Sequence, residues 1–501
     1  MRIQKNIFAN SLGQIYFLLV NIFVTPLYLY YLGPESFGMV GLLTLMLVWL
    51  TVLDVGLSPT LLREVSFSRG VKKYEKLTEI LKSFELIFIT LFFSFVLVVY
   101  LFSDWLSTNW VQSDSLDNFT IKKCLILMSI ISGLRLCQAL YKSGIIGFED
   151  QIWLNKIYIL MTSLRYFGSL LIISFYTQDI VLFFLYQAAI TLIELIIYIR
   201  RLYKLVPEKI RFFRISFNIE SIKNIAPFAS GVAFTSTLWV LVSQTDKLVL
   251  SNFLNLEEYG YFSLIAIVSG AITLLSVPIA QAITPRLTKL YAENNLEQLK
   301  ILYLQSSQYL TLFIYSIALN FALFSKQLIF AWTGNQLVAE WGSNLLILLS
   351  MGNAFFSITA FQYYLQSAFG NLKLHILGSI IFSLIQLPVL LILIIKYGAI
   401  GAGLSWVSLA FLWFIIWSPI IHNKFFPGFH ISWLSKICIT IFFISLVSLC
   451  FYYFVEFFET DSRVIIFLKI FFSGLFSLML SSLSIKELRE FMINRLKKLV
   501  P

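Results

Sequence analysis

Long apolar stretches alternate with short polar segments along the whole chain. Each stretch is about the length that a helix needs to cross the hydrocarbon core of a bilayer, roughly 20 residues. The fourteen stretches cover approximately residues 8–31, 36–58, 80–103, 122–146, 153–175, 178–199, 224–253, 258–284, 301–325, 342–369, 374–395, 398–421, 431–455 and 463–484. The spacers are too short for a folded aqueous domain. The pattern therefore predicts an all-α polytopic membrane protein with about 14 transmembrane helices.

Composition and charge placement agree with a membrane protein. The chain is 59% hydrophobic and 13% charged, whereas ordinary soluble domains are about 25% charged. Most of the 37 Lys and Arg residues lie in alternate connections, which become cytoplasmic if the N-terminus is inside. The positive-inside rule then predicts that both termini are cytoplasmic. The net charge of +11 is explained by topology, so it does not indicate nucleic acid as a partner.

A weak internal repeat divides the chain into halves. Residues 32–43, LGPESFGMVGLL, align with residues 254–265, LNLEEYGYFSLI. An even number of helices in each half predicts two parallel six-helix lobes around a central cavity, the architecture of alternating-access transporters. The predicted parts are an N-terminal lobe (1–199), a basic cytoplasmic connector (200–223), a C-terminal lobe (224–421) and the last two helices with a basic cytoplasmic tail (422–501).

Two arginines lie near the middle of predicted spans. Arg135 is in the stretch 122–146 and Arg165 is in the stretch 153–175. A cation at that depth costs roughly 2.5–3.5 kcal/mol on insertion scales, so it usually faces a partner or a wet cavity. We expect no carboxylate at the same depth, because Glu194 is close to the inner end of its predicted helix. The arginines therefore predict a cationic cavity and an anionic cargo.

Further candidates line the same predicted cavity. Lys142 continues the polar stripe of Arg135. Arg63 and Arg286 end two predicted helices at the cytoplasmic face, where they either bind the anionic cargo as it enters the cavity or only fix the topology. Polar residues that recur every three or four positions predict lumen-facing sides of helices. These are Asn10, Gln14, Asn21, Gln138, Asn353, Gln362 and Gln366. The alternative is hydrogen bonding between helices, on the order of 0.6 kcal/mol for each bond.

Three charged residues are candidates for coupling transport to an ion, H⁺ or Na⁺. They are Asp54, Asp246 and Lys247, and Asp246 could equally pair with a base on another helix. No phosphate-binding loop motif, nucleophile elbow or Cys/His metal cluster occurs in the sequence. We therefore expect no metal, no cofactor and no enzymatic activity.

Three segments carry a resemblance to a known family. The run from Asn10 through Pro26 to LGPESFG (32–38), the helix ending in LDVGLSPTLLRE (53–64) and the segment SQTDKLVLSNFLNLEEYGYFS (243–263) are similar to polysaccharide transporters. These transporters belong to the MATE-related multidrug/oligosaccharidyl-lipid/polysaccharide (MOP) exporter superfamily. The branch that the chain resembles most is the O-antigen (Wzx-type) flippases.

The resemblance implies a function at the bacterial plasma (inner) membrane. Such proteins flip undecaprenyl-pyrophosphate-linked oligosaccharide from the inner to the outer leaflet by ion-coupled alternating access, beside other polysaccharide assembly proteins. The arginines would bind the pyrophosphate, and the polyprenyl tail would stay in lipid, between the lobes or along helices 13 and 14. The alternatives are a lipid II flippase, a MATE-type multidrug antiporter, which would favour acidic cavity residues, and a membrane glycosyltransferase or polymerase, which would need a large outer loop.

Overall fold

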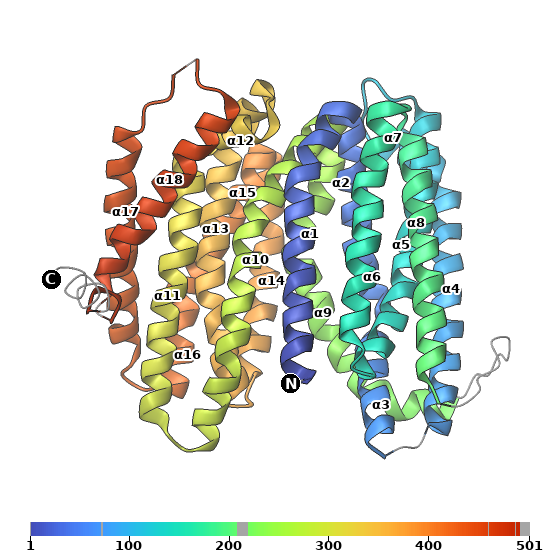
Figure 1. The fold of residues 1–501 in the computed structure, drawn as a ribbon, viewed down its shortest axis with the longest axis horizontal. Helices are drawn as coiled ribbons and strands as arrows, with labels where there is room; N and C mark the ends of the chain where they lie inside the picture. The colour runs from blue at the N-terminus through green and yellow to red at the C-terminus, as the bar shows by residue number, and fades with distance from the viewer. Residues whose placement is uncertain (1, 72–73, 208–218, 459, 486, 491–501) are drawn as a thin grey trace. The chain divides into compact units, whose positions relative to one another are not determined.

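The chain folds into helices joined by short connections, as Figure 1 shows. The computed structural model describes residues 2–71, 74–207, 219–458, 460–485 and 487–490, and no strand occurs among them. Contacts divide the chain into two compact units, Met1–Gly260 and Tyr261–Pro501, here called unit 1 and unit 2.

The described residues of unit 1 form nine α-helices and the first turn of a tenth. They are α1 (Arg2–Leu32), α2 (Pro34–Leu50), α3 (Leu57–Val71), α4 (Glu75–Trp105), α5 (Asn118–Gly147), α6 (Gln151–Ser163), α7 (Ser169–Phe175), α8 (Ile180–Leu205), α9 (Ile219–Phe253) and the start of α10 (Leu256–Ala292). Short 3₁₀ or π turns, η1 (Thr51–Asp54), η2 (Leu106–Trp110) and η3 (Leu164–Gly168), extend or join these helices.

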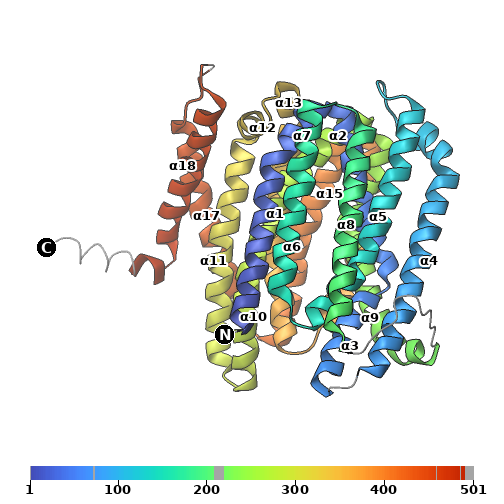
Figure 2. The same ribbon diagram turned by 45° about the vertical axis from the view of Figure 1, so that its right-hand side comes forward.

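In unit 2, the part of the chain that the structure describes forms the rest of α10 and eight further α-helices. They are α11 (Leu296–Leu323), α12 (Ser325–Thr333), α13 (Gln336–Ala368), α14 (Lys373–Tyr397), α15 (Ala399–Leu412), α16 (Ser418–Phe425), α17 (His430–Phe454) and α18 (Arg463–Ser481). The π turn η4 (Trp413–Trp417) joins α15 to α16, and the 3₁₀ turn η5 (Ser482–Ser484) follows α18. Figure 2 shows α17 and α18 lying beside each other.

The predicted class, an all-helical polytopic membrane protein, is confirmed. Within the described residues, 12 helical segments are long and apolar enough to cross a membrane. The pair α11 and α12, bent by 83° at its break, makes a 13th if it forms one span. The predicted span 224–253 falls in α9, where many side chains lie outside the described part. The count of 14 and the cytoplasmic termini stay predictions.

The predicted division of the chain also stays a prediction. The two units are separated after Gly260, and α9 belongs to unit 1 by its contacts with α2, α3 and α4. Residues 208–218 of the basic connector lie outside the described residues.

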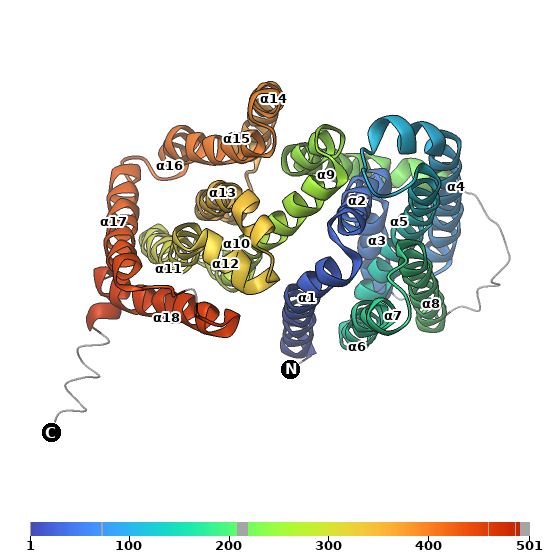
Figure 3. The same ribbon diagram turned by 90° about the horizontal axis from the view of Figure 1, so that it is seen from above.

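Helix α5 is the centre of unit 1. It packs against α2, α3, α4 and α8, as the view in Figure 3 shows. Its buried Leu140 and Ile145 join a core with Phe84 of α4 and Tyr198 of α8. Asp117 caps the helix by accepting from the backbone nitrogen of Thr120 at 3.1 Å, and the hydrogen bond from the Thr120 hydroxyl lowers the pKa of Asp117. Because α5 is buried over 67% of its spanning window, it is a fixed support for Arg135 and Lys142.

Two glycines that the repeat aligns lie against each other in unit 1. A Cβ added to Gly38 would lie 2.1 Å from the backbone oxygen of Leu256, and one added to Gly260 would lie 2.6 Å from that of Pro34. The N-terminal turns of α2 and α10 approach this closely only because both residues lack a side chain.

We therefore expect Gly38→Ala to destabilise the fold, because backbone atoms cannot yield to the added methyl group. The cost should be about 1–3 kcal/mol, as for other overpacked sites. Thermal unfolding of the purified protein measures it, with Gly270→Ala as control, since nothing lies within 4 Å of a Cβ at Gly270. Equal unfolding temperatures for the two variants would contradict this packing.

Candidate functional site

Three helical segments of unit 1 bring four charged side chains together. Arg135 and Lys142 come from α5, Arg165 from the π turn η3 and Glu194 from α8. Nη2 of Arg165 forms an ion pair with Oε2 of Glu194, and Nζ of Lys142 lies 3.8 Å from Oε1. Arg135 is close enough to interact electrostatically with both Arg165 and Glu194. These four residues, named here the unit 1 charge cluster, hold three cations against one carboxylate.

Glu194 is enclosed by donors. The hydroxyl of Tyr198 donates to Oε1 at 2.7 Å, and Nε2 of Gln138 lies 3.3 Å from Oε2. The glutamate is only 1% exposed. A buried carboxylate stays ionised only where cations and hydrogen-bond donors replace the water it has lost, and this site supplies both.

The expectation that Arg165 has no carboxylate at its depth is wrong. The predicted span ended at residue 199, which put Glu194 near a helix end, but α8 continues to Leu205. Glu194 therefore lies near the middle of α8, level with Arg165 near the middle of its own span. The pair gives Arg165 a structural role between η3 and α8.

Both arginines of the cluster have hydrogen-bond donors that are not used by the described residues. Nε of Arg135 and Nε of Arg165 are both buried without a hydrogen-bond partner in the described part of the chain. Arg135 is half-buried, and the Lys142 side chain is 28% exposed. A guanidinium has five N–H donors in a planar fork. Both arginines therefore have a donor left for a further acceptor, such as a phosphate oxygen.

Helix α1 fixes the turn that carries Arg165. The hydroxyl of Tyr28 donates to the backbone oxygen of Tyr166 at 2.9 Å, and Nδ2 of Asn21 donates to the Tyr166 hydroxyl at 3.2 Å. Ser169 bonds back to the backbone oxygen of Arg165. Single π turns inside α-helices frequently occur at functional sites, and this one places a cation at mid-helix.

Four of the predicted lumen residues are buried and bonded within their own unit. Gln138 donates to the backbone oxygen of Thr191, and Asn353 to that of Ser269, both at 2.8 Å. Gln362 bonds to Ser418, and Gln366 accepts from the backbone nitrogen of His375. All four make the hydrogen bonds between segments that the alternative describes, and their role in a lumen stays a prediction. Gln14 is exposed and Asn21 is half-buried, while the side chain of Asn10 lies outside the described part.

The other candidates make contacts of their own. Asp54 accepts from the backbone nitrogen and hydroxyl of Ser58, which caps the start of α3. Arg63 is exposed and lies 3.6 Å from Glu64, and Arg286 in unit 2 is exposed.

Asp246 and Lys247 do not form a pair with each other. Nζ of Lys247 donates to Oε1 of Gln244 at 2.8 Å. Oδ1 of Asp246 is buried with no hydrogen-bond partner in the described part of the chain. The ion-coupling roles of Asp54, Asp246 and Lys247 stay predictions.

A second buried charge cluster in unit 1 was not predicted from the sequence. Nζ of Lys82 lies 2.9 Å from Oε2 of Glu85, and the hydroxyls of Tyr141 and Tyr203 also bond to Glu85. The signal available in the sequence was the i, i+3 spacing of opposite charges at the start of an apolar helix. The Lys82–Glu85 ion pair is one to one, in contrast to the two cations that share Glu194.

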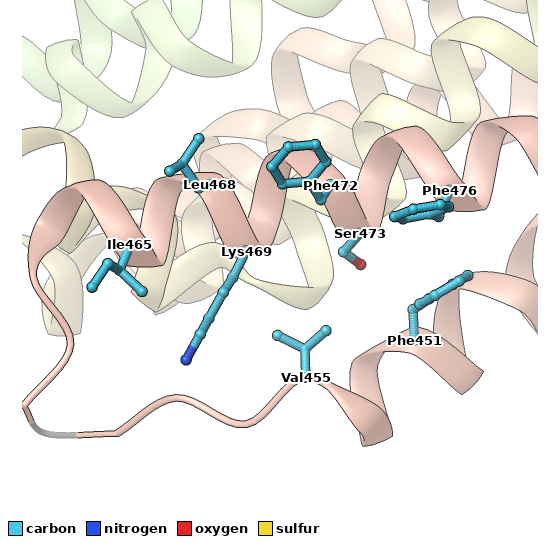
Figure 4. A pocket seen from close by; sticks show the side chains of 8 residues that line it. All are labelled: Phe451, Val455, Ile465, Leu468, Lys469, Phe472, Ser473 and Phe476. Atoms are coloured by element: carbon cyan, nitrogen blue, oxygen red, sulfur yellow. The ribbon is translucent and has the colours of Figure 1, made fainter.

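Unit 2 contains an apolar cavity between α17 and α18, shown in Figure 4. Its volume is about 360 Å³, and Phe451, Val455, Ile465, Leu468, Phe472 and Phe476 form most of its lining. Lys469 at its edge is neutralised by Asp461 at 2.5 Å, and this bond holds the pKa of Asp461 below its usual range. The cavity suits hydrocarbon and not an anionic group.

Comparison with known families decides the relationship. A family model described as "Polysaccharide biosynthesis protein" matches residues 3–291, more than half of the chain. The chain belongs to this family. A protein of Shigella flexneri named "Putative O-antigen transporter" is 22% identical over 380 residues, which are 75% of this chain and 87% of that protein.

Solved structures show the same fold. A lipid II flippase, MurJ, in an inward closed conformation matches with a TM-score of 0.68 and 16% identity, covering 95% of this chain and 98% of its own. An inward-facing MATE family multidrug resistance transporter of the MOP superfamily matches with a TM-score of 0.60 and 18% identity, covering 83% of this chain and 96% of its own. The family match confirms the predicted relationship to polysaccharide biosynthesis proteins, the solved structures share the fold, and the candidate spans among the described residues agree with a multi-pass membrane protein. The location in the bacterial inner membrane stays a prediction.

The Lys82–Glu85 pair should be needed for stability. Lys82→Met or Glu85→Gln alone leaves a buried partner uncompensated and should cost about 3–5 kcal/mol. The double variant should recover most of that loss, because neither charge remains unpaired. Thermal unfolding of the four proteins, followed by tryptophan fluorescence, measures the effect. Additive losses in the double variant would show that the pair is not the source of stability.

Proposed function

We propose that this protein moves an undecaprenyl-pyrophosphate-linked oligosaccharide, an O-antigen or related repeat unit, from the inner to the outer leaflet. The observation that carries the proposal is the excess charge of the unit 1 charge cluster. Arg135, Lys142 and Arg165 face a single carboxylate, Glu194. The family and the O-antigen relative support a polysaccharide cargo.

The cluster is chemically suited to a pyrophosphate. Arginine forks match the oxygens of phosphate groups bidentately, and charge-assisted hydrogen bonds are roughly twice as strong as neutral ones. A pyrophosphate brings several acceptor oxygens and more negative charge than one carboxylate, so it can engage all three cations together. Moving such a group between leaflets requires a polar environment within the bilayer, because an isolated charge in hydrocarbon is very costly.

Other parts of the cargo need different surroundings. The apolar cavity between α17 and α18 offers a lining that suits a segment of polyprenyl chain. Transport needs no bond to be made or broken in the cargo, so the proposal assigns no enzymatic step. Coupling to H⁺ or Na⁺ and contact with other assembly proteins remain part of the proposal.

Lipid II transport is the second candidate, because the MurJ likeness extends over nearly the whole chain. That likeness is one of fold, and both cargoes carry a polyprenyl pyrophosphate. Expression in cells depleted of their lipid II flippase separates the two functions, since rescue of growth would favour lipid II. A multidrug antiporter for cationic drugs is disfavoured, because the excess charge of the cluster is positive.

Removing the unpaired arginine should disable transport without leaving a buried carboxylate unpaired. We expect Arg135→Gln to lower export of the repeat unit about tenfold or more, as expected for the loss of a charge-assisted hydrogen bond. Surface polysaccharide in a strain that depends on this protein measures export, and membrane content of the variant is measured in parallel.

Lys289→Gln is the matched control, because Lys289 is an exposed cation on α10 whose side chain is 73% accessible. It should leave export unchanged. Normal surface polysaccharide with Arg135→Gln at wild-type membrane content would refute the proposed role of the cluster.

A further inference from the structure

The unit 1 charge cluster already contains an anion. Glu194 forms an ion pair with Arg165 through Oε2 and a longer contact with Lys142 through Oε1. A bound phosphate would replace these two carboxylate oxygens. Its single negative charge leaves Arg135 without an ion-pair partner in the described part of the chain. The resting site is therefore occupied, incompletely, by a group of the protein itself.

We propose that Glu194 is a resident counter-anion that the cargo phosphate displaces from Arg165 and Lys142, and that the released carboxylate takes up one proton. This inference rests on the proposed function and names the competitor that the cargo must replace. It makes Glu194 a residue that sets both the affinity and the pH dependence of cargo binding.

Charge and geometry favour the exchange. One carboxylate contacts two of the three cations, and the contact with Lys142 is long at 3.8 Å. A pyrophosphate carries more charge and can also reach Arg135, whose Nε is unused among the described residues. Arg165 keeps an anionic partner throughout, so the exchange never leaves a buried guanidinium unpaired, which would be strongly unfavourable.

The proton follows from the surroundings of Glu194. The charged and titratable groups that face it are Arg135 and Lys142 from α5, Tyr158 from α6, Arg165 from η3 and Tyr198 from its own helix. Once the cations are bound to phosphate, only neutral donors remain for this buried carboxylate, and burial favours its uncharged form. The balance is simple: one proton from water is bound to Glu194 for each cargo group that replaces it.

Binding of undecaprenyl pyrophosphate to the full-length protein in lipid nanodiscs tests this exchange. We expect Glu194→Gln to bind about tenfold more tightly than wild type at pH 8, because the competitor is gone. The two affinities should converge as the pH falls, since a protonated Glu194 no longer competes. Calorimetry in two buffers of different ionisation enthalpy should show proton uptake approaching one per lipid in wild type and none in the variant.

Glu149→Gln is the matched control. Glu149 is also a paired carboxylate of unit 1, but it is exposed and bonded to Arg69 and not to the charge cluster. Its variant should bind with wild-type affinity and wild-type proton uptake. Where Glu194→Gln fails to fold, Tyr198→Phe serves instead, because it removes one neutral donor to Glu194 and should tighten binding severalfold.

The outcomes separate the two proposals. Wild-type protein that binds the lipid while folded Glu194→Gln binds no tighter, with unchanged proton uptake, overturns the exchange and leaves the proposed function intact. Binding by wild type that Arg135→Gln does not weaken overturns the proposed function, and the exchange falls with it.

Discussion

The ion pair between Arg165 and Glu194 is the interaction on which the candidate site depends. Both groups lie near the middle of membrane-spanning helices, where an unpaired charge is costly. The pair removes that cost for Arg165 but leaves Arg135 and Lys142 with only a share of the same carboxylate. One carboxylate neutralises only part of the positive charge of the three cations. Such a site is stable when empty and still attracts an anion.

The surrounding helices hold the pair in place through neutral hydrogen bonds. Tyr28 of α1 bonds to the backbone of the turn that carries Arg165, and Tyr198 and Gln138 bond to Glu194. The second buried cluster of unit 1 shows the contrast. The Lys82–Glu85 ion pair is one to one, whereas Glu194 is shared by two cations of the charge cluster.

Much of the fold could be predicted from the sequence because membrane-spanning helices are determined by length and hydropathy. The family could be recognised from short segments near Gly38 and Gly260, and the structure shows that these glycines meet. The partner of Arg165 could not be predicted from the sequence. The predicted helix ended at residue 199 and not at Leu205, which put Glu194 near a helix end instead of mid-depth. Side-chain pairing depends on which helix faces are in contact, and apolar spans carry little information about that. For the same reason the hydrogen bonds of Gln138, Asn353, Gln362 and Gln366 to other segments could not be predicted from their helical spacing.

The most direct measurement is an experimental structure of the protein with undecaprenyl pyrophosphate bound. The account predicts phosphate oxygens within hydrogen-bond distance of Arg135 and Arg165, with Lys142 beside them and Glu194 withdrawn from its ion pair. Phosphate bound elsewhere, with the Arg165–Glu194 pair intact, would contradict it.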